Sequence, residues 1–243
     1  LNPSEPVNGD PSAAFHDNPY AIYATGNSMS TYIWNVITGD AEFSLPFNIK
    51  LGARVMGNIR NATTETKYAD GSVNYTSQYT QGKNNTMDLT YQGRITWGDY
   101  FFNDRLHVDA AAFIEQEDYH YTSLSANTSK GLTIAGLYNL NNSNDYVGAS
   151  NSETNYKTRS VFGNATASWD DTYFLDLSLR NDWDSRLPNG ANSYLYGGAS
   201  VSVMLSQLIH ADWLRFWKLR ASAAQVGSTL GAYDTSYTYS TGK

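Results

Sequence analysis

The sequence predicts an all-β protein whose antiparallel strands form part of a transmembrane β-barrel wall. Apolar and polar side chains alternate with a period of two along most of the chain, as in strands that have one face of each kind. Short turns alternate with much longer polar connections, which is typical of outer-membrane barrels. Aromatic side chains gather beside the short turns, where a membrane interface would favour them.

The composition excludes several other classes. The chain has 243 residues with a mean hydropathy of -0.48, and no run approaches the roughly 20 consecutive apolar residues of a membrane helix. Its net charge is -7 and its 16 Lys and Arg residues are scattered, so it lacks the basic surface of a nucleic-acid-binding protein. The absence of cysteine excludes a disulfide scaffold and thiolate metal sites.

Residues 1–28 contain Pro3, Pro6 and Pro11 among small polar residues and show no sustained period, which predicts a loop. The remaining residues, 29–243, are predicted to form a partial barrel domain. Its first hairpin joins a strand over 30–44 to a strand over 49–58 through a short turn at 45–48. The first of these strands has the least regular alternation in the chain.

The second hairpin joins residues 87–97 to residues 106–115 through an aromatic turn at 99–104. Both strands alternate strictly, with Leu89, Tyr91 and Ile95 on one face of the first and Asp88, Gln92 and Arg94 on the other. Few strands of soluble proteins alternate so regularly, and this pattern favours a wall between lipid and water.

Two further hairpins complete about eight predicted strands. The third joins residues 163–169 to residues 173–183 through a tight turn, and the fourth joins residues 199–205 to residues 217–223. The segment between the last two strands, residues 205–216, fits a short amphipathic helix equally well, because a brief apolar run does not define its own period. Polar stretches near 60–84, 120–155 and 184–193 are predicted to be external loops.

The charged side chains near the strand centres argue for a water-filled lumen on the polar side. An arginine on the lipid side would cost about 2 to 4 kcal/mol near the bilayer midplane, so a register slip of one residue would be heavily penalised. The predicted lumen-lining residues are Arg54, Asp88, Gln92, Arg94, Asp109, Asp176, Arg180 and Arg220.

Two segments carry a family resemblance. The stretch Leu179–Pro188 (LRNDWDSRLP), followed by Ser193–Tyr196 (SYLY), resembles a signature of the SusC/RagA family of TonB-dependent outer-membrane transporters from Bacteroidetes-type bacteria. The stretch Lys218–Gly227 (KLRASAAQVG) is similar to a second motif of that family, in the same order and spacing. The sequence departs from the family at Gly198, where a proline is common, and at Ala223, which replaces an aromatic residue.

The resemblance implies a barrel of about 22 strands with a plugged lumen. It also implies a SusD-like surface lipoprotein as a lid, energy from TonB, and uptake of glycan oligosaccharides or, in some members, peptides. Neither a plug domain nor a TonB-contacting segment is recognisable in the sequence. We therefore expect these residues to be a middle portion of a longer transporter, embedded in outer-membrane lipid.

The sequence contains no motif for catalysis, for a metal or for another cofactor. The four histidines lack ligand spacing, and neither a nucleophile elbow nor a phosphate-binding loop is present. Aromatic rings beside amide and carboxylate groups suit the recognition of sugars. The candidate cargo contacts, all assigned to loops, are Tyr119, Tyr121, Tyr138, Tyr146 and Trp183.

Two other functions fit parts of the pattern. A self-contained eight-strand barrel of structural or adhesive type fits the even number of strands. A soluble, all-β carbohydrate-binding module also fits, because a sandwich shows the same alternation with its apolar face turned inward.

Overall fold

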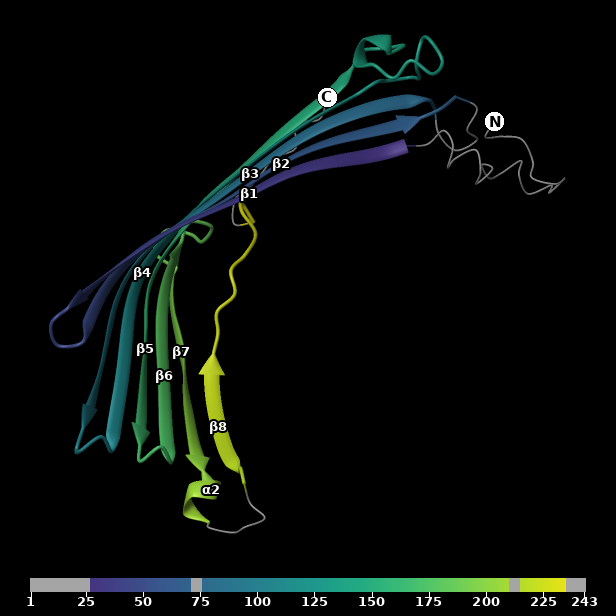
Figure 1. Cartoon of the computed structure of the whole chain (residues 1–243). Helices are drawn as coiled ribbons and strands as arrows, with labels where there is room; N and C mark the ends of the chain where they lie inside the picture. Colours follow the sequence, from purple (N-terminus) through teal and green to yellow (C-terminus); the bar gives the residue numbers. More distant parts are fainter. Residues whose placement is uncertain (1–26, 71–75, 210–214, 235–243) are drawn as a thin grey trace. The chain divides into compact units, whose positions relative to one another are not determined.

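The computed structural model describes residues 27–70, 76–209 and 215–234. Within these ranges the chain forms eight strands, one short helix and one turn of 3-10 helix (Figure 1). The strands are β1 (Asn27–Leu45), β2 (Ile49–Tyr68), β3 (Gln78–Phe101), β4 (Leu106–Asn127), β5 (Gly148–Trp169), β6 (Tyr173–Asp184), β7 (Ser193–Met204) and β8 (Lys218–Gln225). The 3-10 turn η2 (Leu140–Asn142) precedes β5, and helix α2 (Leu205–Leu208) follows β7.

The eight strands form one sheet in sequence order, from β1 to β8. Each strand is hydrogen-bonded to the strand that precedes it and to the strand that follows it, so β1 and β8 are the two edges. A closed eight-strand barrel would require β1 to pair with β8. The alternative of a self-contained barrel is therefore wrong for this sheet.

The register of β5 to β8 gives the sheet two chemically distinct faces. One cross-strand row contains Ala165, Leu177, Ala199 and Ala223, and the adjacent row contains Thr166, Asp176, Ser200 and Ser222. Because side chains alternate along a strand, these two rows lie on opposite faces. We call the face that carries Leu177 the apolar face and the face that carries Asp176 the polar face. The predicted alternation of residues 173–183 is confirmed.

The apolar face is not covered by a second layer. Leu175, Leu177 and Leu179 are 39%, 46% and 58% exposed, and the buried apolar residues within the described ranges are only Ala62, Tyr79 and Leu132. A β-sandwich would bury such leucines between its two sheets. The alternative of a soluble sandwich is therefore wrong for the described part of the chain.

The short turns lie where the sequence predicts them. The turns after β1, β3 and β5 contain non-glycine residues with positive φ angles, among them Asn48 (60°) and Asn103 (54°). Between β5 and β6, Asp170 and Asp171 both have a φ of 49°. Trp169 pairs with Tyr173, so this hairpin turn contains three residues, 170–172, and the first two have positive φ angles.

The long connections are shorter than predicted because the strands continue beyond their apolar segments. Strand β2 extends to Tyr68 and β3 begins at Gln78, so much of the predicted loop at 60–84 is strand. Likewise β4 extends to Asn127 and β5 begins at Gly148, which reduces the predicted loop at 120–155 to residues 128–147. Backbone pairing between strands remains favourable where both faces become polar, and the sequence then loses its alternation.

Two other predicted segments are only partly described. Helix α2 contains just four residues at the start of the predicted segment 205–216, of which 210–214 lie outside the described residues. Most of the predicted loop at 1–28 also lies outside them, and β1 begins at Asn27.

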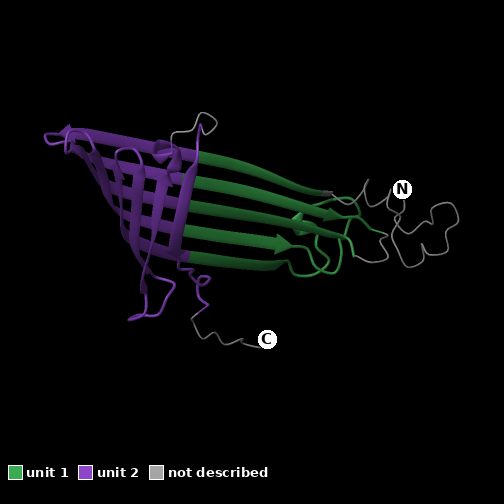
Figure 2. Cartoon of the chain, turned by 90° about the horizontal axis from the view of Figure 1, so that it is seen from below, with its two compact units in different colours: residues 1–35, 58–87, 120–154 green, residues 36–57, 88–119, 155–243 purple. Residues whose placement is uncertain are grey.

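The chain divides into two compact units, coloured separately in Figure 2. Unit 1 comprises residues 1–35, 58–87 and 120–154, and unit 2 comprises residues 36–57, 88–119 and 155–243. Among the described residues, no helix has both the length and the apolar character needed to span a bilayer.

The two faces should respond differently to a new charge. In a lipid bilayer, Leu177→Arg should destabilise the protein by about 2 to 4 kcal/mol, because the charge replaces an exposed leucine on the apolar face. Ser178→Arg, one residue along on the polar face, is the matched control and should cost less than about 1 kcal/mol. Urea unfolding of the full chain in lipid vesicles measures both values. Equal losses for the two variants would contradict the assignment of faces.

Candidate functional site

The polar face of unit 2 carries two ion-pair networks. The first joins β1, β2 and β3, and its central residue is Arg94. The Arg94 guanidinium donates from Nη1 to Asp40 Oδ2 at 2.8 Å and from Nη2 to Asp40 Oδ1 at 2.9 Å and Glu42 Oε2 at 3.0 Å. Arg54 Nε donates to Asp40 Oδ2 at 2.7 Å. A paired fork of this kind fixes the orientation of the carboxylate as well as its charge.

Gly52 makes this first network possible. A Cβ atom at position 52 would lie 2.5 Å from Arg94 Nε and 2.8 Å from Arg94 Cγ. The arginine on β3 therefore crosses the bare backbone of β2 to reach β1. Glycine within a strand commonly marks such a close approach.

The second network joins β3, β4, β5, β6 and β7 and is organised by Arg180. Its Nε donates to Asp182 Oδ1 at 2.8 Å, and its Nη2 donates to Ser160 Oγ at 2.8 Å and Glu115 Oε1 at 3.3 Å. Tyr196 and Gln92 complete the network by donating to Asp182 Oδ2 at 2.7 Å and Glu115 Oε2 at 2.8 Å. Asp182 is only 4% exposed, so its charge depends on these partners.

Two groups of stacked aromatic rings lie against arginines of unit 2, and the first of them contacts the second network. The guanidinium carbon of Arg180 lies 4.6 Å from the centre of the Phe162 ring, which stacks on Phe113 with the same centroid separation of 4.6 Å. Near the long connections, Tyr119 stacks on Tyr156 at 4.5 Å, and Arg186 lies 4.2 Å from the centre of the Tyr156 ring.

Arg186 also pairs with Asp184, whose side chain is fully buried. Arg186 Nε donates to both Asp184 carboxylate oxygens, at 2.9 and 3.0 Å. The Arg186 backbone N–H donates to Asp184 Oδ1 at 2.9 Å. The pKa of Arg186 is raised, first by its side-chain hydrogen bonds to Asp184.

The predicted lumen residues all fall within unit 2, and the structure places five of them in or near these networks. Arg54 and Arg94 belong to the first network, and Gln92 and Arg180 to the second. Asp88 lies on the same strand as Gln92 and Arg94, and one of its carboxylate oxygens is buried with no hydrogen-bond partner among the described residues.

The other three predicted lumen residues do not join the networks. Asp109 Oδ2 lies 3.2 Å from His107 Nε2. Asp176 is opposite Thr166 and Ser200 in the strand ladders, and Arg220 is opposite Ser202. Whether any of these eight residues lines a lumen remains a prediction.

The predicted cargo contacts are dispersed. Tyr119 and Tyr121 lie within β4 rather than in a loop, because that strand extends to Asn127. Tyr138 and Tyr146 do lie in the connection between β4 and β5. Tyr146 is 92% exposed, and Lys67 Nζ lies 5.8 Å from the centre of the Tyr138 ring.

The assignment of Trp183 to a loop is wrong. Trp183 lies within β6, where it is opposite Arg159 on β5 and Ser193 on β7. Its position in the alternation places it with Leu179 on the apolar face, whereas Arg180 and Asp182 lie on the polar face. Trp183 therefore does not contribute to the polar surface described above.

The connection at residues 128–147 is ordered by the side chain of Asn142. Its Oδ1 accepts from the Ile134 N–H at 3.0 Å, and its Nδ2 donates to the carbonyls of Ile134 at 2.8 Å and Leu137 at 2.7 Å. Asn142 is 6% exposed. Buried polar groups that are fully hydrogen-bonded rigidify a loop.

Ion pairs in the connections shift the pKa values of their members. Lys130 Nζ lies 2.6 Å from Asp145 Oδ2, and this hydrogen bond lowers the pKa of Asp145 and raises that of Lys130. In a short turn, the side-chain hydrogen bonds between Arg105 and Asp170 lower the pKa of Asp170 and raise that of Arg105.

Sequence reasoning missed most acceptors of the two networks. Asp40, Glu42, Glu115 and Asp182 were not predicted as site residues, although each is a charged residue in a predicted strand. The alternation of β6 was sufficient to place Asp182 beside Arg180.

Together the networks present fixed guanidinium donors and carboxylate acceptors, which can bind a polar or charged solute. No group of acidic, histidine or cysteine side chains within the described ranges is suited to hold a metal ion.

Comparison with known proteins identifies the fold. No family model and no curated protein matches the sequence. Three solved structures are similar over most of the chain: the RagAB peptide transporter (17% identity, TM-score 0.74, 85% of this chain and 24% of that one), the RagAB peptide importer in an "open-open" state (16%, 0.77, 90% and 25%) and the same importer in a "closed-closed" state (17%, 0.70, 85% and 24%).

These similarities show that the eight strands have the fold of a segment of such a transporter. The chain spans about a quarter of the length of the chains it matches. The resemblance to the SusC/RagA family is thus confirmed at the level of the fold.

The crossing of Arg94 over Gly52 should be sensitive to one methyl group. Gly52→Ala should destabilise the protein by about 1 to 3 kcal/mol, because the added Cβ displaces the guanidinium from Asp40. Gly39→Ala on the neighbouring strand is the matched control, since a Cβ there meets nothing within 4 Å. Urea unfolding midpoints in detergent measure both effects, and an unchanged midpoint for Gly52→Ala would be inconsistent with the geometry.

Arg180 and Asp182 should show strong energetic coupling. Arg180→Met leaves the buried Asp182 carboxylate with Tyr196 but without a cation, and should cost about 3 to 5 kcal/mol. Asp182→Asn in the same chain should restore part of that loss. A double-mutant cycle by urea unfolding measures the coupling. Additive losses would show that the two side chains act independently.

Proposed function

We propose that this chain is a wall segment of a SusC/RagA-type importer in the bacterial outer membrane. The observation that carries the proposal is a single sheet with an uncovered apolar face and an ion-paired polar face. A one-layer sheet of this kind needs lipid on one side and water on the other. The similarity in fold to RagAB chains supports the same reading.

The dimensions of the apolar face fit a bilayer. In the β5–β6 ladder, Trp169 is opposite Tyr173 near the short turn, and Arg159 is opposite Trp183 at the other end. The two pairs are 169 − 159 = 10 residues apart. At a rise of about 3.3 Å per residue and a tilt of about 40°, this spacing corresponds to roughly 25 Å, the height of the apolar band of an outer-membrane barrel. Aromatic residues thus border the band at both ends.

The polar face is the proposed lumen wall. Its guanidinium and carboxylate groups are held by one another, so a passing solute meets fixed hydrogen-bonding groups rather than mobile charges. We propose that Arg54, Asp88, Gln92, Arg94, Asp109, Asp176, Arg180 and Arg220 line this lumen. We assign transport and not catalysis to the surface. A SusD-like lipoprotein and TonB are the proposed partners.

Peptides are the cargo that we favour. The first network exposes charges of both signs at Arg54, Asp40 and Glu42, which complement the charged termini and side chains of an oligopeptide. The similar solved structures are described as a peptide importer. Glycan oligosaccharides are the second candidate, because the stacked rings of Tyr119 and Tyr156 offer a flat surface for a sugar.

Calorimetry on the full chain in detergent tests the cargo. A pool of oligopeptides should bind and a pool of neutral oligosaccharides should not. Arg54→Gln should weaken peptide binding by about tenfold, because it removes an exposed cation of the first network.

Tyr173→Ala is the control, since Tyr173 lies on the apolar face and should leave the affinity unchanged. Binding of oligosaccharides alone would favour the second candidate. Failure of the chain to enter lipid vesicles would contradict the proposal as a whole.

A further inference from the structure

Arg159 is a cation on the apolar face. In the β5–β6 ladder it is opposite Trp183, two residues beyond the Val161–Asn181 pair and four beyond the Gly163–Leu179 pair. The same face carries the exposed leucines of β6. An arginine in such a position is tolerated only near a membrane interface, where its cost falls to about 0 to 1 kcal/mol. The spacing from Trp169 places Arg159 at that interface.

The guanidinium of Arg159 retains free donors. Its Nε donates to Gln116 Oε1 at 3.1 Å, and within the described ranges its two Nη groups meet no protein acceptor. Lys157, the next side chain on this face of β5, is a second exposed cation and lies 3.3 Å from Asp118 Oδ1. Gln116 Nε2 also donates to Asp118, at 3.1 and 3.2 Å. Two cations against one engaged carboxylate leave the rim with a net positive charge.

An apolar groove begins beside this rim. A depression of about 860 Å³ includes Arg159, Gln116 and Trp183 in its lining. It shares Val161 and Trp183 with a second depression of about 640 Å³, which continues over β5 and β6. The two depressions therefore meet at Val161 and Trp183 on the apolar face, and Arg159 lies beside this junction in the lining of the larger one.

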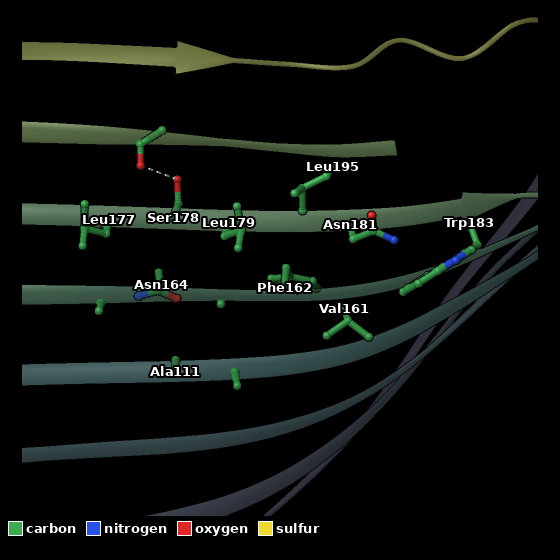
Figure 3. A pocket seen from close by; sticks show the side chains of 14 residues that line it. Ala111, Val161, Phe162, Asn164, Leu177, Ser178, Leu179, Asn181, Trp183 and Leu195 are labelled. Atoms are coloured by element: carbon green, nitrogen blue, oxygen red, sulfur yellow. Dashed lines mark hydrogen bonds between the residues drawn. The ribbon is translucent and has the colours of Figure 1, made fainter. Parts of the chain in front are cut away.

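Small residues keep the groove open. Figure 3 shows its β5–β6 part, with Leu177 and Leu179 on β6 and Val161 on β5. Gly163 and Ala165 lie opposite these two leucines. A Cβ at position 163 would lie 3.0 Å from the carbonyl oxygen of Ala111, so the backbone there has little room for a larger side chain. The groove therefore has a floor of small residues on β5 and is bordered by the leucines of β6.

We propose that this groove binds one phosphate-bearing lipid of the outer leaflet. Its phosphate is held by the Nη groups of Arg159 and by Lys157, and one acyl chain lies over Gly163 and Ala165. A planar guanidinium with two free nitrogens matches a phosphate in a paired hydrogen bond, and Trp183 supplies an amphipathic ring at the same depth. This inference rests on the proposed membrane location.

The test uses the full chain in detergent and two forms of lipid A, bisphosphorylated and enzymatically dephosphorylated, with identical acyl chains. Native mass spectrometry measures the affinity for each. The wild-type protein should prefer the phosphorylated form by about tenfold, as expected for a charge-assisted contact. Arg159→Gln should abolish this preference. Lys130→Gln, which removes an exposed cation in the connection between β4 and β5, should retain it.

A second variant tests the groove without altering a charge. Ala165→Leu fills the trough with an apolar side chain that a lipid-facing position tolerates, and should weaken the binding of both lipid forms. Equal binding of the two forms by the wild type would overturn the inference, as would a preference that survives in Arg159→Gln. A chain that inserts into vesicles yet shows no preference contradicts only this inference, whereas a chain that fails to insert contradicts the proposed function as well.

Discussion

The structure depends on one constraint, which is that the two faces of the sheet cannot be exchanged. In β6, neighbouring residues such as Leu179 and Arg180 point to opposite sides. Moving the strand by one residue would place Arg180 and Asp182 among the leucines and would break a network that involves five strands. Register, ion pairing and the exposure of the apolar face therefore support one another, and no element can shift alone.

Where the sequence alternates, it predicts both the strand and its faces. Residues 173–183 could be assigned to a strand, and each side chain to a face, from the sequence alone, because leucines and charged residues alternate strictly. The same rule applied to Trp183 would have placed it on the apolar face, and its assignment to a loop ignored that rule. The long strands β2 and β5 were truncated in the prediction because their outer parts are polar on both faces. In such segments the strand is maintained by backbone hydrogen bonds to its neighbour. The sequence of one strand alone does not show this pairing.

The long-range pairs of the ion-pair networks could not be predicted because their members are distant in sequence. Arg94 and Asp40 are 54 residues apart, and they meet only after three strands have found their register. The sequence does contain one sign of this contact, since Gly52 interrupts the alternation of side chains along β2. A glycine in such a position indicates that something crosses it, but the identity of the crossing side chain depends on the fold.

The connection between β4 and β5 has a further consequence. Residues 134–142 of this connection are held partly by one amide, since Asn142 supplies three hydrogen bonds to the backbone of Ile134 and Leu137. Side chains at its surface, such as Tyr146, take no part in that scaffold. Exposed side chains of this loop can therefore change during evolution without loss of the hydrogen bonds that hold its backbone. Within this short segment, the residues that are free to vary differ from the residues that stabilise its conformation.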